Sequence, residues 1–130
     1  MSSVRTLVVE DFAPFLRFIS TTLAPRRDLQ VICEVSDGLE PVQKAEELKP
    51  DLILLDMGLP RLNGIEAARR IRKLVPESKI IFLTQDSSAE VVQEALSLGA
   101  RGYVVKVNAE RHLLAAVEAV ISGKRFVSST

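Results

Sequence analysis

Short apolar runs alternate with amphipathic segments along the whole chain. Each run is bounded by turn residues, a pattern that predicts buried parallel strands. The predicted strands are Thr6–Val9, Gln30–Val35, Leu52–Leu55, Ile80–Leu83 and Gly102–Val105. The segments between them place apolar residues at helical spacing. The predicted helices are Phe12–Leu23, Leu39–Leu48, Gly64–Leu74, Ala89–Leu98 and Glu110–Ser122. This alternation predicts an α/β fold, with a five-stranded parallel sheet and helices on both faces.

Proline and glycine support these helix bounds. Pro14 falls in a predicted first turn, where its missing N–H costs little. Gly99 and Gly123 follow predicted helices as C-terminal stops. Apolar periodicity is lost after Gly123, so we expect residues 1–122 to form the domain and residues 123–130 to begin a linker or C-terminal tail.

Composition narrows the class of protein. Hydrophobic residues make up 47%, charged residues 26%, and the formal net charge is zero. Bulk charge therefore gives no reason to expect nucleic-acid binding. No apolar run approaches the ~20 residues of a membrane span, and the N-terminus lacks the apolar core of a signal peptide. We expect a cytoplasmic protein with no membrane partner.

Polar residues follow four of the predicted strands. They are Glu10 and Asp11 after the first strand, Asp56 after the third, Thr84 after the fourth and Lys106 after the fifth. Because open parallel sheets bind ligands at the carboxyl ends of their strands, we expect these side chains to converge.

This set of side chains suits phosphoryl transfer. Three crowded carboxylates repel one another, and an oxygen-preferring cation such as Mg²⁺ relieves the repulsion. A carboxylate such as Asp56 can act as a nucleophile and form an aspartyl phosphate. Mg²⁺ and Lys106 would neutralise the oxygens, and Thr84 would donate a hydrogen bond. Asp11 has a second role open to it, as the N-cap of the first helix, and the two roles are compatible.

A series of motifs in this order resembles the response-regulator receiver domain over essentially the whole chain. The motifs are Val9–Asp11, Leu54–Pro60, Asn63–Gly64, Leu83–Thr84, Gly99–Ala100 and Gly102–Lys106. Two segments, Gly99–Val107 and Gly123–Ser128, are similar to the receivers of LuxR-type transcription regulators. The resemblance implies a flavodoxin-like, doubly wound (βα)5 fold. It also implies a signalling protein rather than an enzyme.

The resemblance also implies residue roles. Asp56 would accept a phosphoryl group from a histidine kinase, with Lys106 pairing with the phosphate. Mg²⁺ would be held by Glu10, Asp11, Asp56 and the backbone carbonyl of Gly58. Thr84 and Tyr103 would form the switch that follows phosphorylation. The output would be transcription through a helix-turn-helix domain that this sequence lacks, so DNA would be contacted only by that domain.

Alternatives remain open for several of these features. Tyr103 also suits ordinary strand packing. Gln85 follows Thr84, where many receivers have a small residue, so slower phosphorylation or a degenerate receiver acting as a protein-binding scaffold is the main alternative. A hydrolase is disfavoured because Asp56-Met57-Gly58 lacks a second acid. A nucleotide-binding module is disfavoured because no Gly-x-Gly-x-x-Gly motif occurs.

A small, weakly polar stripe on the last predicted helix is the remaining feature. It consists of His112, Ala115 and Ala119, and Phe18 flanks the core side of the first helix. Such a stripe is either plain surface or the contact of a homodimer formed through the terminal helices.

Overall fold

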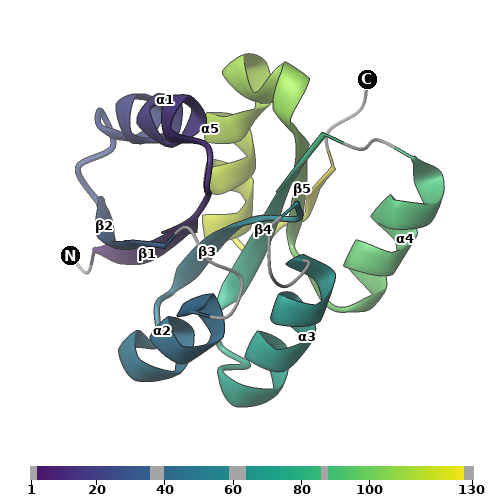
Figure 1. Ribbon diagram of the computed structural model, residues 1–130. Helices are drawn as coiled ribbons and strands as arrows, with labels where there is room; N and C mark the ends of the chain where they lie inside the picture. The colour runs from purple at the N-terminus through teal and green to yellow at the C-terminus, as the bar shows by residue number, and fades with distance from the viewer. Residues whose placement is uncertain (1–2, 36–39, 59–63, 86–87, 128–130) are drawn as a thin grey trace.

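The computed structural model describes residues 3–35, 40–58, 64–85 and 88–127. Its strands are β1 (Val4–Val9), β2 (Leu29–Val35), β3 (Leu52–Asp56), β4 (Lys79–Thr84), β5 (Gly102–Val105) and β6 (Phe126–Val127). Its helices are α1 (Ala13–Leu23), α2 (Glu40–Leu48), α3 (Gly64–Leu74), α4 (Ala89–Ser97) and α5 (Ala109–Ile121), with a short 3₁₀ helix, η1 (Lys106–Asn108), between β5 and α5. The elements thus alternate between strand and helix as predicted (Figure 1).

The strands form one sheet in the order β2-β1-β3-β4-β5-β6, and every neighbouring pair is parallel. The chain order reverses direction between β1 and β3, which is the point where such sheets bind ligands. Val9 of β1 is in register with Leu55 of β3. Glu10, which follows β1, and Asp56, which ends β3, therefore lie beside each other at this edge of the sheet.

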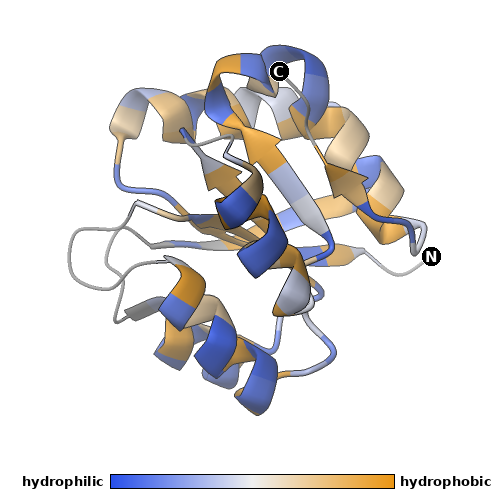
Figure 2. Ribbon diagram, turned by 90° about the vertical axis from the view of Figure 1, so that its right-hand side faces the viewer, coloured by the Kyte–Doolittle hydropathy of each residue, from blue (hydrophilic) through white to orange (hydrophobic). Residues whose placement is uncertain are grey.

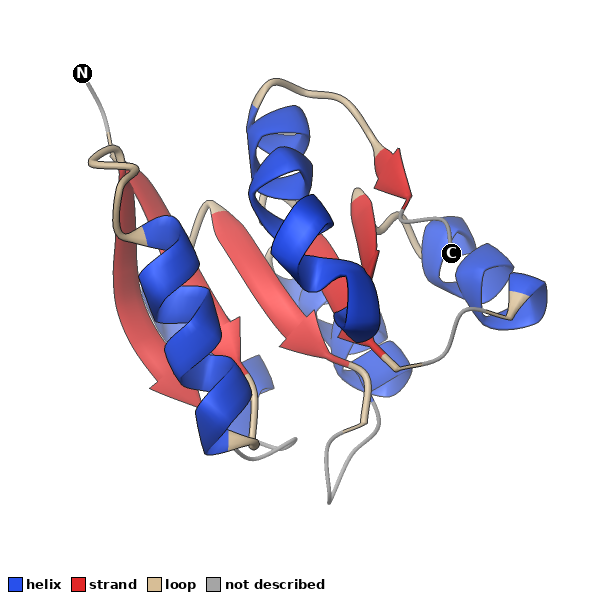
Figure 3. Ribbon diagram, turned by 90° about the horizontal axis from the view of Figure 1, so that it is seen from above, coloured by secondary structure: helices blue, strands red, loops and turns tan. Residues whose placement is uncertain are grey.

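Helices cover both faces of the sheet. Helices α1 and α5 lie on one face, and α2, α3 and α4 lie on the other (Figures 1 and 3). Each face has its own apolar cluster. One includes Ile19, Leu54 and Val117, and the other includes Ile53, Ile71 and Phe82. Figure 2 shows the corresponding colouring, with largely hydrophobic strands between helices that carry both hydrophobic and hydrophilic stretches.

The prediction of five strands is wrong in number, because Phe126 and Val127 add a sixth. They are in register with Gly102 and Tyr103 of β5. The Phe126 amide donates a hydrogen bond to the Arg101 carbonyl at 3.0 Å. A strand of two residues has no periodicity that a sequence pattern could reveal. Two residues of the expected tail thus belong to the sheet.

The other predicted bounds differ little from the structure. The bounds of α3 and β5 coincide with the predictions, and β1 begins at Val4 rather than Thr6. The predicted start of α2 at Leu39 lies outside the described residues. Gly99 and Gly123 have φ angles of 94° and 89°, as expected for residues that end helices. Within the described residues, no helix is both long and apolar enough to cross a membrane.

Candidate functional site

The carboxyl edge of the sheet opens into a cavity of about 1030 Å³. Asp11, Asp56, Thr84 and Lys106 line it, each from beyond or at the end of a different strand. The predicted convergence of these four side chains is therefore present in the structure. Gly58 lines the cavity as well, whereas Glu10 and Tyr103 do not.

Three carboxylates gather at the end of β1 and β3. Glu10, Asp11 and Asp56 each place one oxygen within 4.8 Å of the others. Glu10 and Asp56 are buried, at 1% and 4% exposure, whereas Asp11 is exposed. Of the three carboxylates that are expected to repel one another, two are thus buried and one faces solvent.

Glu10 uses its two oxygens for different partners. Its Oε2 accepts a hydrogen bond from the Phe12 amide at 3.1 Å. Its Oε1 lies 2.9 Å from the Lys106 ammonium, although no donor in the described part of the chain meets that oxygen with hydrogen-bond geometry. Burial raises the pKa of Glu10, and the charge of Asp56 adds to the rise, while Lys106 and the Phe12 amide oppose it.

The N-cap of the first helix is not Asp11, the residue that the sequence offered for this role. Phe12 occupies the N-cap position of α1, and no side chain caps it by a hydrogen bond. Glu10, two residues earlier, instead accepts a hydrogen bond from the Phe12 amide. Capping by Asp11 is therefore wrong for this structure, and its carboxylate faces the cavity.

Lys106 sits between the two buried carboxylates. Its ammonium is 2.9 Å from Glu10 Oε1 and 3.4 Å from Asp56 Oδ2. Glu10 is thus the nearer of the two partners of Lys106. The ammonium also lies 4.9 Å from the centre of the Phe15 ring. Sequence patterns missed this contact, since Phe15 shows only as a core position of an amphipathic helix.

Asp56 is fixed by the loop that follows it. Its Oδ1 accepts a hydrogen bond from the Gly58 amide at 2.9 Å. The Gly64 amide, at the start of α3, donates to the Met57 carbonyl at 3.1 Å. A Cβ at Gly64 would lie 2.6 Å from Met57 Cα, so only glycine allows α3 to begin this close to the strand end. The segment 59–63 lies outside the described residues.

The two predicted switch residues occupy different surroundings. Thr84, at the end of β4, is 4% exposed and lines the cavity together with the exposed Gln85. Tyr103 is fully buried in β5 and does not line the cavity. It belongs to the apolar cluster that contains Phe82 and Ala95, on the sheet face covered by α4. Its ring is thus an element of the core.

The side chains at this edge fit a small divalent cation. All three clustered acids offer oxygen, the ligand that Mg²⁺ prefers. Glu10 Oε1 is buried, and its nearest positive charge is the Lys106 ammonium at 2.9 Å, so a divalent cation would add to the neutralisation of the cluster. Lys106 supplies part of that positive charge in this structure.

Comparisons with known proteins point in one direction. A family model described as "Response regulator receiver domain" matches residues 6–118. The chain is 33% identical over 125 residues to the response regulator GacA of Pseudomonas viridiflava, covering 96% of this chain and 58% of that protein. It is also 33% identical over 122 residues to the response regulator protein VraR of Staphylococcus aureus, covering 94% and 58%. The chain therefore spans somewhat over half the length of these curated relatives.

Solved structures show the same fold. A LuxR-family two-component response regulator from Aurantimonas sp. SI85-9A1 matches with a TM-score of 0.85 and 32% identity, covering 96% of this chain and 89% of the other. The isolated receiver domain of RcsB from Salmonella enterica, solved with a phosphomimetic, matches with a TM-score of 0.91. At 23% identity, over 98% of this chain and 95% of the other, that second match bears on the fold alone.

Proposed function

Because this chain belongs to the response regulator receiver domain family, we propose that Asp56 accepts a phosphoryl group from the phosphohistidine of a histidine kinase. The observation that supports this most directly is the placement of Asp56 at the cavity, 3.4 Å from the Lys106 ammonium and within 4.8 Å of two further carboxylates. Such a carboxylate has the charge neutralisation that an acyl phosphate needs.

The proposed reaction moves one phosphoryl group. An Asp56 carboxylate oxygen attacks phosphorus, the bond from phosphorus to the kinase's imidazole nitrogen breaks, and the imidazole takes up a proton from water. The Gly58 amide holds the other Asp56 oxygen, which leaves Oδ2 as the attacking atom. Lys106 would then pair with the phosphoryl oxygens, and the Thr84 hydroxyl would donate to them.

A divalent cation is part of this proposal. Glu10, Asp11, Asp56 and the carbonyl of Gly58 would hold Mg²⁺, with Asp11 as the solvent-facing ligand. When bound, Mg²⁺ would supply positive charge for the phosphoryl oxygens. This chain's own contribution is to hold two buried carboxylates beside the Lys106 ammonium.

The test is direct phosphorylation by a small donor. The protein is incubated with Mg²⁺ and acetyl phosphate, and its intact mass is measured. We expect one added phosphate in the wild type and none in Asp56→Ala. Asp51→Ala is a matched control, because Asp51 precedes the same strand at the opposite edge of the sheet and should leave the adduct unchanged.

The other outcomes decide between functions. No adduct, with Mg²⁺ demonstrably bound, would overturn phosphoryl transfer and favour the protein-binding scaffold. Continuous release of inorganic phosphate without an adduct would favour a hydrolase. Gln85 lies at the cavity, so Gln85→Ala measures its effect on the rate without removing any proposed ligand.

The downstream steps belong to the same proposal. Phosphorylation would shift a two-state equilibrium in which Thr84 and Tyr103 take part. The output would be transcription, carried by a DNA-binding region outside this segment. Since the chain has one tyrosine and no tryptophan, its intrinsic emission reports on Tyr103. Emission that stays constant on phosphorylation of Asp56 would count against Tyr103 as a switch.

A homodimer through the terminal helices also remains a prediction. Ala115 is exposed on α5, while His112 is half-buried and contacts the Phe126 ring at a centroid distance of 5.6 Å. Part of the predicted stripe is therefore covered by β6. Sedimentation of the protein with and without phosphorylation would measure whether two copies associate.

A further inference from the structure

The Lys106 ammonium has an aromatic neighbour in addition to its two acidic ones. The centre of the Phe15 ring lies 4.9 Å from Nζ. A cation within ~6 Å of a ring face is attracted by the negative face of the aromatic system. Lys106 is only 15% exposed, which strengthens this attraction because little water surrounds the charge.

The position of Phe15 is set by the first turn of α1. Pro14 occupies the start of the helix, and the Phe15 amide donates to the Phe12 carbonyl at 3.0 Å. The Phe12 amide in turn donates to Glu10 Oε2. Glu10 therefore contacts Lys106 with one oxygen and holds the start of the Phe15-bearing helix with the other. The Phe15 ring also packs against the Phe18 ring, with 5.4 Å between the ring centroids.

The neighbours of Lys106 differ in what a divalent cation would do to them. Glu10 and Asp56 are two of the proposed ligands, so a bound cation would share their charge and repel the ammonium. The Phe15 ring is neutral and offers no ligand atom to Mg²⁺. Its attraction for Lys106 would therefore persist when the acidic cluster is occupied.

We propose that Phe15 is a positioning residue for Lys106, which keeps the ammonium beside Asp56 when a divalent cation occupies the acidic cluster. Lysine has a long stem with several rotatable bonds, and Lys106 begins η1 rather than continuing β5. A side chain of this kind needs lateral contacts to stay in one place. The kinetic consequence of this inference rests on the proposed transfer to Asp56, but the contact itself does not.

Three variants separate positioning from ordinary packing. Phe15→Leu keeps an apolar side chain and removes the ring face, whereas Phe15→Trp keeps a ring with a stronger attraction for cations. Phe18→Leu is the matched control, since Phe18 lies on the same helix, is half-buried like Phe15 and packs against the same apolar cluster. It does not contact the ammonium through any described interaction.

The first measurement needs no phosphodonor. A ring face over a methylene group shifts its proton resonances upfield, so the Lys106 ε-methylene protons serve as the probe in NMR spectra. We expect the upfield shift in the wild type, Phe15→Trp and Phe18→Leu, both with and without Mg²⁺. We expect it to be absent in Phe15→Leu. An absent shift in the wild type, or one that Mg²⁺ abolishes, would overturn the inference.

The second measurement is the rate of phosphorylation by acetyl phosphate at saturating Mg²⁺. Phe15→Leu should be about five-fold slower, the equivalent of about 1 kcal/mol, whereas Phe15→Trp should match or exceed the wild type. Equal slowing by Phe15→Leu and Phe18→Leu would indicate packing alone and overturn the inference. If the wild type takes no phosphate, the proposed function fails and the NMR result with Mg²⁺ alone decides the role of Phe15.

Discussion

At the scale of single residues, the surroundings of Glu10 act on its pKa in opposite directions. Its carboxylate is buried against Asp56, which raises its pKa, yet Lys106 and the Phe12 amide need it charged. The ionised form pairs with Lys106 and accepts the stronger hydrogen bond from the Phe12 amide. The net effect of burial and pairing is a raised pKa of Glu10.

The raised pKa of Glu10 predicts a specific dependence of stability on pH. Above the ordinary value of 4.5, the unfolded chain loses the Glu10 proton before the folded protein does. The contribution of Glu10 to the free energy of unfolding should therefore fall as pH rises from 4.5 to the raised pKa, and then stay constant.

This dependence is measured as a difference between two proteins. Urea unfolding without Mg²⁺ is followed across this pH range for the wild type and Glu10→Gln, and the difference cancels the titration of other groups. We expect the wild type to lose stability relative to the variant as pH rises. A difference that grows in favour of the wild type would contradict the assignment.

Gly64 provides a second test at this scale. Alanine there would place its Cβ 2.6 Å from Met57 Cα and 2.8 Å from the Asp56 carbonyl oxygen, both of them backbone atoms. Although alanine favours helices, Gly64→Ala should lower the free energy of unfolding by about 1–3 kcal/mol, because the strand end must move. Gly58→Ala is the control, since its Cβ would meet only Asp56 Oδ1 at an ordinary 3.7 Å. Equal losses in the two variants, measured by urea unfolding, would refute the explanation.

At the scale of elements, regular patterns were sufficient for most of the fold. Helix α3 could be placed from the sequence because its apolar residues recur at helical spacing, and β5 because it is a short apolar run bounded by turn residues and fully buried. The convergence of strand ends followed from parallel topology. The site was therefore predictable as a group of residues.

What the sequence could not predict depends on side-chain geometry between distant elements. Lys106 lies nearer to Glu10 than to Asp56, and its contact with Phe15 joins η1 to α1. The order of these distances is decided by how α1 and η1 sit on the sheet, which no spacing encodes. The burial of Tyr103 could not be predicted either, since aromatic residues suit both edge and core positions of strands.

The contribution of strand β6 to stability can be tested at the scale of elements. Phe126 is half-buried, packs against the cluster on the α5 face and contacts His112. Phe126→Ala should lower the free energy of unfolding by about 1–2 kcal/mol, less than the 3–5 of a fully buried phenylalanine. Val127→Ala, at a position that is 44% exposed, should cost much less. Urea unfolding that ranks the two variants in the opposite order would show that β6 contributes little packing.

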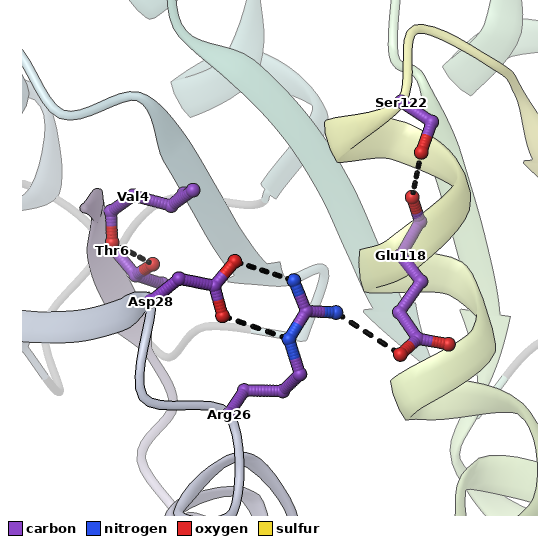
Figure 4. Close-up of polar contacts among 6 residues, drawn as sticks. All are labelled: Val4, Thr6, Arg26, Asp28, Glu118 and Ser122. Carbon is purple, nitrogen blue, oxygen red and sulfur yellow. Dashed lines mark hydrogen bonds and ion pairs between the residues drawn. The ribbon is translucent and has the colours of Figure 1, made fainter. Parts of the chain in front are cut away.

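At the scale of the whole molecule, one arginine connects the turn between α1 and β2 to the last helix (Figure 4). Arg26 pairs with Asp28 through two contacts of 2.8 and 2.6 Å and with Glu118 of α5 at 3.0 Å. These partners raise the pKa of Arg26, and the Arg26 guanidinium lowers the pKa of Asp28. The bridge lies at the edge of the sheet opposite to the cavity, where β1 and β2 begin.

The strength of this bridge can be measured with a double-mutant cycle. Arg26→Gln, Glu118→Gln and the double variant should show a coupling energy of about 0.2–1 kcal/mol, because both side chains are partly exposed. Salt should reduce the coupling, since it screens exposed charges. A coupling that is zero at low salt would mean that α5 is held to this turn by apolar packing alone.

Strand β6 also changes how much of the sheet edge is open to pairing with other copies of the molecule. Unpaired strand edges are templates on which other chains add, and native proteins keep such edges short or covered. Here β6, itself two residues long, pairs with Gly102 and Tyr103 and so covers half of β5. A folded unit that stopped at α5 would instead present the four residues of β5, all buried in this structure, as an open edge. The residues after α5 thus shorten the strand edge that this side of the sheet leaves open to other chains.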